Sequence, residues 1–346
     1  MRSDHADGES LMPYAPAWFC EAAAARIADG RLVCGPKTYA CHGGVWNASD
    51  MAVSANQKQT ESTFGFKWKK ETTFDSPASL DRMRGWLVER YGPFEEVLSL
   101  LPPMPVILDA GCGAAMSALE YFNPFSKIRY IGCDVSEAVW VAAKRIYERT
   151  RDTANTVFFR DDITQLPFAP HSMDCIFSEG VLHHTDSTKG ALASLAPLLK
   201  PGGLFLFYIY RKKGPVREFT DDYMRDKLQT MPPEKAWEAL KPLTDIGIQL
   251  GASDLEIDLP DGFPLLEIPA GKISLQRFFY WHVAKAFYRP ELSFEEMHHI
   301  NFDWYAPKNA HRQTPEEVAA WCSELGLEIR HMRPEDAGIT VVARKQ

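Results

Sequence analysis

The sequence predicts an α/β protein in which helices cover both faces of a mostly parallel sheet. Two observations predict this class. Short apolar runs alternate with helical segments between residues 80 and 211, and glycine or proline marks the ends of many of these elements. Such runs are apolar throughout because both faces of a parallel strand are buried. Strands that alternate with helices are typical of βαβ units.

The predicted elements follow one another in a regular order from residue 86. A first helix, residues 86–101, has apolar side chains at helical spacing and stops at two prolines. The predicted strands are residues 105–111, 128–133, 157–160, 173–178 and 204–210, and the helices between them are residues 114–121, 137–149 and 189–199. The last of these helices stops at a Pro-Gly-Gly stretch.

Composition changes on both sides of this region. Residues 1 to about 60 are rich in small side chains and weakly patterned, so we expect a partly ordered arm. Residues 215–303 are mostly helical pieces rich in aromatic side chains. Residues 314–325 then have the pattern of a capped helix, and residues 327–332 and 339–344 are expected to form an antiparallel hairpin at the sheet edge.

Composition and charge narrow the function classes. The 346 residues are 45% hydrophobic and 24% charged, which is the balance of a soluble globular protein. No apolar stretch approaches about 18 residues, so we expect no membrane span. The net charge of −8 argues against nucleic-acid binding. An N-terminus without a signal pattern, and seven cysteines without a C-x-x-C pair, predict reduced thiols in the cytoplasm. We expect a monomer or homodimer.

A glycine-rich loop follows the first predicted strand. Asp109 to Gly113 read DAGCG at the point where open α/β sheets bind their ligands, and glycines there let the backbone approach a ligand closely. Asp134 ends the second strand 25 residues later, where an acid can accept hydrogen bonds from a ribose diol. These two features alone also fit a dinucleotide-dependent oxidoreductase.

Five segments, two of which contain the glycine loop and Asp134, decide between these possibilities. LDAGCG, GCDVS, DDITQLPF, MDCIFSEGVLHH and LKPGGLFLF occur in this order. On these motifs, residues 84–210 resemble the class I S-adenosyl-L-methionine-dependent methyltransferases, specifically the branch with the ubiquinone/menaquinone C-methyltransferases. Residues 327–344 resemble them more loosely. The resemblance implies a Rossmann-like, seven-stranded, mostly parallel sheet and S-adenosylmethionine as the cofactor.

The resemblance also implies a domain organisation. Residues 1–79 would form an N-terminal arm with a candidate lid, and residues 80–214 the cofactor-binding core. Residues 215–310 would be a helical, aromatic insertion between the fifth strand and the last helix, and would cover the substrate. Residues 311–346 would complete the core with the last helix and the terminal hairpin.

Cofactor-binding residues follow from the same motifs. The glycines would pass under the methionine part of the cofactor, Asp134 would bind the ribose hydroxyls and Asp162 the adenine amino group. The implied set is Asp109, Gly111, Cys112, Gly113, Asp134, Val135, Asp162, Ile163, Glu179 and Leu182. Asp161 competes with Asp162, and Glu179 is alternatively a solvated edge residue. Ala115 departs from the family pattern, in which many members carry a third glycine.

Two histidines are the candidate catalytic residues. Because a sulfonium already carries an excellent leaving group, the protein must mainly hold the acceptor in line with the methyl group. A hydroxyl acceptor benefits from a general base, whereas a neutral amine or thiolate needs none. His183 and His184 follow the fourth strand, on the edge of the sheet where the methyl group is expected. A packing or capping role is the alternative for both.

Basic and aromatic side chains follow the fifth strand on the same edge. In a chain of net charge −8, Arg211, Lys212, Lys213 and Arg217 indicate an anionic substrate, with a solvated turn as the alternative. Residues 301–312 suit either a pocket wall or a seam between domains. The predicted substrate-binding residues are Tyr208, Tyr210, Arg211, Lys212, Tyr305, His311 and Arg312.

Two N-terminal features remain open. Residues 64–68, FGFKW, suit either a second lid or an anchor for the arm. Cys20, Cys34, Cys41 and His42 lie where some related proteins carry a zinc ribbon, but they lack the paired spacing of such a site. We therefore expect no metal.

The sequence predicts an enzyme that transfers a methyl group from S-adenosylmethionine to a small, anionic or aromatic metabolite, with O-methylation as the first hypothesis. N- or C-methylation of a small molecule is the first alternative. A methyltransferase acting on RNA or protein, a catalytically idle scaffold that binds S-adenosylmethionine, and a nicotinamide-dependent oxidoreductase are the others.

Overall fold

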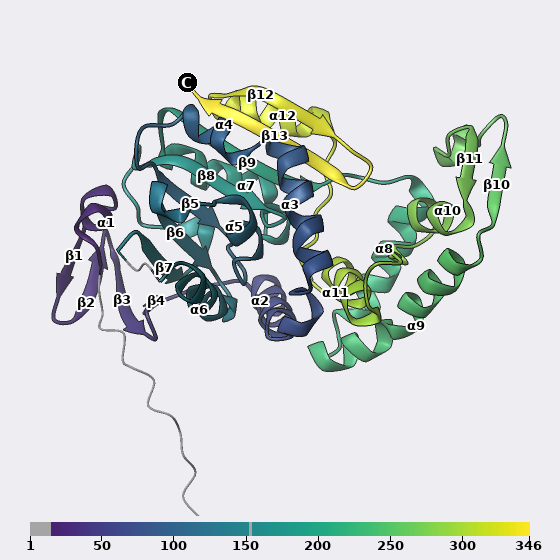
Figure 1. The fold of residues 1–346 in the computed structure, drawn as a ribbon, viewed down its shortest axis with the longest axis horizontal. Coiled ribbons are helices and arrows are strands. Elements are labelled where there is room, and N and C mark those ends of the chain that lie inside the picture. Colours follow the sequence, from purple (N-terminus) through teal and green to yellow (C-terminus); the bar gives the residue numbers. More distant parts are fainter. Residues whose placement is uncertain (1–14, 152–153) are drawn as a thin grey trace, which may run out of the picture.

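The computed structural model describes residues 15–151 and 154–346. In this part of the chain, one eleven-stranded sheet has the order β1-β2-β3-β4-β7-β6-β5-β8-β9-β13-β12, and a separate hairpin pairs β10 with β11 (Figure 1). Helices lie on both sides of the large sheet (Figure 1). The segment from α8 to α11, with the β10–β11 hairpin, lies beside the sheet, on the right in this view (Figure 1).

The strands of the large sheet are β1 (Ala25–Ala28), β2 (Arg31–Cys34), β3 (Lys37–His42), β4 (Val45–Ala48), β5 (Val106–Ala110), β6 (Arg129–Asp134), β7 (Thr156–Arg160), β8 (Met173–Glu179), β9 (Leu199–Tyr210), β12 (Leu327–Pro334) and β13 (Gly338–Lys345). The hairpin strands are β10 (Glu256–Leu259) and β11 (Gly271–Ser274). The helices are α1 (Ala17–Ala22), α2 (Ala55–Trp68), α3 (Pro77–Tyr91), α4 (Phe94–Ser99), α5 (Met116–Tyr121), α6 (Ala138–Thr150), α7 (Thr188–Leu195), α8 (Pro215–Leu228), α9 (Pro233–Ala252), α10 (Leu275–His282), α11 (Phe294–Tyr305) and α12 (Pro315–Glu324).

The predicted parallel sheet is present, but it has more strands than the seven expected. Strands β7, β6, β5, β8 and β9 are parallel, and β13 inserts antiparallel between β9 and β12. The additional strands β1 to β4 form an antiparallel ladder that joins the sheet through parallel pairing of β4 with β7. The topology is therefore Rossmann-like with a mixed sheet.

The N-terminal arm differs most from the prediction. Its strands are four to six residues long, too short for a clear alternation of apolar and polar residues. Leu32, Tyr39 and Trp46 are nevertheless almost fully buried and pack in the same apolar core as β5 to β9. The first residues of the predicted arm, 1–14, lie outside the described part of the chain.

Some element boundaries also differ. The helix predicted for residues 86–101 is two helices, α3 and α4, because Gly92 adopts φ +80° and Pro93 follows it. The Pro-Gly-Gly stretch predicted to end a helix lies inside β9, where Gly203 has a backbone carbonyl 2.9 Å from the position of a β-carbon. Residues 215–303, predicted to be mostly helical, contain α8, α9, α10 and most of α11, together with the β10–β11 hairpin, which was not predicted.

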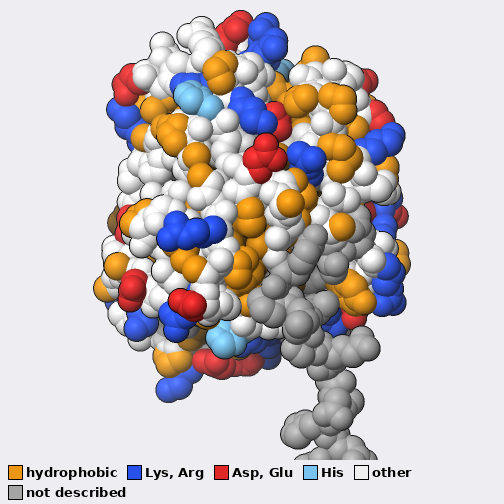
Figure 2. All heavy atoms as spheres, turned by 90° about the vertical axis from the view of Figure 1, so that its left-hand side faces the viewer, with side chains coloured by type: hydrophobic (Ala, Val, Ile, Leu, Met, Phe, Trp, Pro, Cys, Tyr) orange, Lys and Arg blue, Asp and Glu red, His pale blue; other side chains and the backbone are white. Residues whose placement is uncertain are grey.

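None of the described helices is long and apolar enough to cross a membrane. On the face that carries the N-terminal strands, basic and acidic side chains are interspersed (Figure 2).

A buried ion pair fastens the N-terminal strands to the parallel sheet. The side chain of Asp161, which follows β7, is fully buried and accepts hydrogen bonds from Lys37 Nζ at 2.7 Å and from the Tyr39 hydroxyl at 2.7 Å. A buried charge is tolerated only when it is paired and hydrogen-bonded. These contacts therefore fix β3 against the segment that follows β7.

We expect the substitution Tyr39→Phe to lower the free energy of unfolding by about 1.5–3 kcal/mol, because Asp161 loses one donor to a buried charge. The measurement is chemical denaturation of both proteins. Tyr223→Phe is the matched control, since the Tyr223 side chain is 58% exposed. Equal stability of the Tyr39 variant and the parent protein would contradict the assignment.

Candidate active site

A cavity of about 520 Å³ opens at the carboxyl ends of β5, β6, β8 and β9. Side chains from α2 and α3 close one side of it, and residues of α10, α11 and the turn between them close the other. Pockets of this size hold small-molecule ligands. The strand ends and the two helical segments therefore enclose one continuous binding space.

The glycine loop after β5 forms the floor of one half of this cavity. Gly111 has φ +90°, and a β-carbon there would lie 2.2 Å from Val181 Cγ1. Gly113 has φ +50°, and its β-carbon would lie 3.1 Å from Trp68 Nε1. Only glycine fits the first position, because the loop passes directly against the chain that follows β8.

Asp134 at the end of β6 is held by the same loop. One carboxylate oxygen accepts the Gly113 N–H at 2.9 Å, and the other accepts the Ser136 N–H at 2.8 Å and its hydroxyl at 2.6 Å. Burial raises the pKa of Asp134, whereas these donors and Lys67 act in the opposite direction. The oxygen that accepts from Gly113 can accept one further hydrogen bond from a ligand hydroxyl, whereas the other oxygen already accepts two.

The structure separates the two competing acids after β7. Asp161 is buried against Lys37 and Tyr39 and does not line the cavity. Asp162 and Ile163 line it. Asp162 also caps the following turn, since its carboxylate accepts the Thr164 N–H at 2.8 Å. The two roles considered for Asp162, turn cap and cavity residue, therefore occur together.

The cavity wall contains most of the predicted cofactor residues. These are Gly111, Cys112, Gly113, Asp134, Val135, Asp162, Ile163 and Glu179. Asp109 and Leu182 do not line it. Asp109 is 3% exposed and accepts the Tyr130 hydroxyl at 2.7 Å, and burial raises its pKa to about 7. Leu182 is fully buried in the apolar core.

Glu179 is mostly buried, so the alternative interpretation of a solvated edge residue is wrong. Its carboxylate forms an ion pair with Arg90 and accepts the Tyr91 hydroxyl at 2.6 Å. The Arg90 guanidinium also lies 3.7 Å from the ring centre of Tyr208. Sequence reasoning missed Arg90, because residue spacing within α3 gives no indication of which distant strand it meets.

The two histidines occupy different positions. His184 lines the cavity, whereas His183 does not. His183 Nδ1 accepts the Tyr210 N–H at 3.2 Å, and its ring stacks on Tyr210 with a centroid separation of 3.6 Å. The packing alternative therefore describes the contacts of His183, and a catalytic hypothesis is retained only for His184.

His184 has one bonded and one unbonded ring nitrogen. Its Nδ1 lies 2.6 Å from the carbonyl oxygen of Asn309 and donates to it, because a carbonyl only accepts. Its Nε2 has no hydrogen-bond partner within the described structure. Burial lowers the pKa of His184 to about 4, although nearby Asp303 acts in the opposite direction. Neutral His184 thus presents an unshared electron pair on Nε2.

We expect the His184 imidazole to stay neutral on acidification until the pH approaches 4, about two units below an unfolded histidine. The measurement is an NMR pH titration of protein labelled with ¹³C at histidine Cε1. The His184 signal is assigned by its absence from His184→Asn. A midpoint near 6.5 would contradict the burial seen here.

A buried carboxylate, Asp303, lines the other half of the cavity. Asp303 of α11 forms an ion pair with Lys67 of α2 and accepts the Tyr210 hydroxyl at 2.9 Å. Burial alone would raise the pKa of Asp303, but Lys67, His184 and Lys285 together hold it well below its usual range. Asp303 therefore remains a carboxylate and joins α2, β9 and α11.

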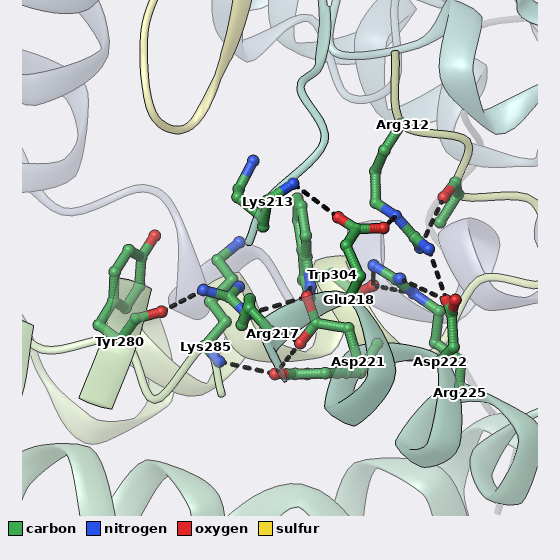
Figure 3. A network of polar contacts seen from close by, with 12 residues as sticks. Lys213, Arg217, Glu218, Asp221, Asp222, Arg225, Tyr280, Lys285, Trp304 and Arg312 are labelled. Atoms are coloured by element: carbon green, nitrogen blue, oxygen red, sulfur yellow. Dashed lines mark hydrogen bonds and ion pairs between the residues drawn. The ribbon is translucent and has the colours of Figure 1, made fainter. Parts of the chain in front are cut away.

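Of the predicted substrate residues, Tyr208 and Tyr210 line this cavity, but Arg211, Lys212, Tyr305, His311 and Arg312 do not. Lys212, His311 and Arg312 line a separate cavity of about 350 Å³. There Arg312 forms ion pairs with Glu218 at 2.7 Å and Asp222 at 2.6 Å (Figure 3).

The two remaining residues have structural contacts instead. Arg211 lies 4.0 Å from Asp336, and the Tyr305 hydroxyl donates to Asp221 at 2.6 Å. Within the basic cluster identified from the sequence, only Lys213 and Arg217 line the larger cavity. The direction of each side chain after β9 depends on the geometry of the turn into α8, which the spacing of residues in the sequence does not give.

Residues 64–68 form part of the cavity wall and attach α2 to the helical insertion, and their role as a lid stays a prediction. Phe64, Lys67 and Trp68 line the cavity. Phe66 instead packs against Trp237 and Phe302, with ring centroids 5.9 and 5.8 Å away, and so attaches α2 to the helical insertion. The segment is thus part of the wall and an anchor at once.

The described residues contain no group of three or more histidine, cysteine, aspartate or glutamate side chains arranged to hold a metal ion. All seven cysteines are free.

Residues 108–207 match the family model described as a methyltransferase domain. This segment is a class I methyltransferase domain. It contains the glycine loop, Asp134, Asp162 and His184, and the cofactor that the methyltransferase resemblance implies is S-adenosylmethionine. The contacts fit this cofactor, because the loop permits close backbone approach and the two carboxylates can accept hydrogen bonds from hydroxyl and amino groups.

Known proteins resemble the methyltransferase domain over part of their length. An O-methyltransferase of Pyrenophora dematioidea is 32% identical over 109 residues, 31% of this chain and 40% of the relative. The malonyl-[acyl-carrier protein] O-methyltransferase of Chlorobium luteolum is 31% identical over 101 residues, 29% and 38% of the two chains. An uncharacterized protein of Synechococcus sp. is 34% identical over 116 residues, 32% of this chain and 26% of the relative. The chain thus spans well under half the length of these relatives.

Solved structures also resemble the chain at low identity. The 1,6-didemethyltoxoflavin-N1-methyltransferase of Burkholderia thailandensis, solved with bound 1,6-didemethyltoxoflavin and S-adenosylhomocysteine, is 12% identical. The match covers 93% of this chain and 98% of that chain, with a TM-score of 0.43.

Proposed function

We propose that this chain transfers a methyl group from S-adenosylmethionine to a small molecule bound in the same cavity. One observation carries the proposal. The cavity is continuous from the glycine loop to an enclosed half lined by aromatic and charged side chains of the helical insertion. A cofactor on the loop and an acceptor under the insertion would therefore meet in one space.

We assign cofactor binding and acceptor binding to different parts of the chain, following the domain organisation predicted from the sequence. The core would bind the cofactor, which supplies the activated methyl group, and residues 215–310 would bind the acceptor. Holding the two reactants in line is worth about 7–11 kcal/mol in favourable cases. The ion pair of Lys67 with Asp303 supports this arrangement, because it fixes α2 to α11 across the cavity.

O-methylation remains the first hypothesis. His184 lines the cavity, and its Nε2, which has no hydrogen-bond partner within the described structure, can accept a proton. Because its pKa is about 4, His184 is a weak base, which favours an acidic hydroxyl such as a phenol or enol over an alkanol. N-methylation, or C-methylation as in the ubiquinone/menaquinone branch, is the alternative, and an idle cofactor-binding scaffold is the second.

The proposal also covers the cellular compartment, the oligomeric state and the class of acceptor. The seven free cysteines support a reducing compartment, which we propose is the cytoplasm. We further propose that the enzyme acts as a monomer or homodimer on a small molecule rather than a nucleic acid. The net charge of −8 supports this choice.

We expect His184→Asn to lower the turnover number at saturating acceptor at least tenfold, because asparagine lacks a basic nitrogen while its amide can still donate to the Asn309 carbonyl. The measurement is transfer of labelled methyl to a panel of phenols, carboxylic acids and amines. His331→Asn, on the exposed side of β12, is the matched control.

An unchanged turnover number in His184→Asn would rule out the base. Cofactor binding without turnover of any acceptor in the panel would favour the scaffold alternative.

A further inference from the structure

Basic side chains without acidic partners gather in the half of the cavity under the helical insertion, which we call the acceptor half. Of the eight lysines and arginines that line it, three form ion pairs within 4.0 Å: Lys67 with Asp303, Arg90 with Glu179 and Arg217 with Asp221. The others have no carboxylate that close among the residues described, and they are Arg82, Lys213, Arg277, Lys285 and Arg289. The cavity wall therefore has unneutralised positive charge.

Lys213 and Lys285 are the most enclosed of this group. Lys213 Nζ donates to the carbonyl oxygens of Arg211 at 2.6 Å and Ala337 at 3.0 Å, and Lys285 Nζ donates to that of Ile300 at 3.3 Å. Both ammonium groups lie near the Trp304 ring, 5.2 and 4.8 Å from its centre. Burial lowers the pKa of Lys285 to about 7 and that of Lys213 well below its usual value.

Asp221, a buried carboxylate close to both lysines, is already saturated with donors. Asp221 accepts Arg217 Nε at 2.9 Å, Trp304 Nε1 at 2.7 Å and the Tyr305 hydroxyl at 2.6 Å (Figure 3). Arg217 is fixed further, because it also donates to the backbone carbonyl of Tyr280 (Figure 3). Asp221 therefore positions Arg217 and forms no ion pair within 4.0 Å with either lysine. The charge of Asp303 also acts on Lys285, but Asp303 is paired with Lys67.

The acids on the cavity wall also have partners of their own. Glu296 accepts hydrogen bonds from three serines, Ser76, Ser79 and Ser293. Glu335 lies 2.9 Å from Arg333, and Asp336 lies 4.0 Å from Arg211. An anion from outside the chain would thus supply the counter-ion that Lys213 and Lys285 lack, and would favour their protonated forms.

We propose that Lys213 and Lys285, with Arg217 between them, form a subsite for a carboxylate or phosphate group of the methyl acceptor. The inference rests on the proposed function and names the acceptor class. Anionic oxygens are the complement of ammonium and guanidinium groups in an enclosed site. The subsite belongs to the acceptor half, because Lys213 follows β9 and Lys285 lies between α10 and α11, whereas the glycine loop and Asp134 lie at β5 and β6.

The test measures anion binding with the cofactor site filled. Each protein is first titrated with S-adenosylhomocysteine and then, in its excess and at pH 6.5, with phenyl phosphate, benzoate and neutral benzamide. The variants are Lys213→Met and Lys285→Met, which keep an unbranched side chain of similar length without its charge. The matched control is Lys212→Met, since Lys212 is exposed and does not line the cavity.

The parent protein and the Lys212 variant are expected to bind phenyl phosphate or benzoate at least tenfold more tightly than benzamide. Each of the other two variants is expected to lose most of this preference while keeping its affinity for S-adenosylhomocysteine. Tighter binding of phenyl phosphate would identify a phosphate acceptor, and tighter binding of benzoate a carboxylate.

Three results would overturn the subsite. They are equal binding of benzamide and the anions, a preference that survives in both variants, and anion binding that S-adenosylhomocysteine abolishes. Failure of the parent protein to bind S-adenosylhomocysteine would instead remove the proposed function itself.

Discussion

The carboxylate of Asp303 is the contact on which the cavity depends. It joins Lys67 from the N-terminal region and Tyr210 from the end of β9 to a helix of the insertion. These three segments are far apart in the sequence, and their contacts with Asp303 bring a charged group from each helix and the end of β9 to one point. Because the carboxylate stays ionised, it retains Lys67 and sets the charge environment of His184 and Lys285. Closure of the cavity and its electrostatics therefore share one cause.

Around this contact, the two halves of the cavity have opposite electrostatic character. The half at the glycine loop presents Asp134 and Asp162, which suit the hydroxyl and amino groups of a nucleoside. The half under the insertion presents Lys213 and Lys285 without acidic partners, beside the ring of Trp304. Such a difference would keep a cofactor and an anionic acceptor in their separate places and bring them together only at the boundary, where His184 lies.

The sequence predicted the features that depend on neighbouring residues in the chain. It did not predict the features that depend on packing between distant segments. The parallel strands and the glycine loop are local patterns, and Asp162 could be chosen over Asp161 from the motif around it. Strands β1 to β4 were missed because each is too short to show a period. The acceptor half depends on long-range packing, so Lys285 gave no signal and Arg211 was chosen where Lys213 faces the cavity. The motif indicated the histidine pair, and packing against Tyr210 distinguished its members.

The central claim is that the glycine loop and Asp134 bind S-adenosylmethionine, and calorimetric titration of the parent protein and Asp134→Ala tests it most directly. Asp245→Ala, an exposed acid on α9, is the control, and NADH is the competing ligand. Thermal unfolding first establishes that both variants fold. Micromolar binding of S-adenosylmethionine and S-adenosylhomocysteine that is lost only in Asp134→Ala is the predicted result. Binding of NADH in their place, or equal affinity in both variants, would contradict the account.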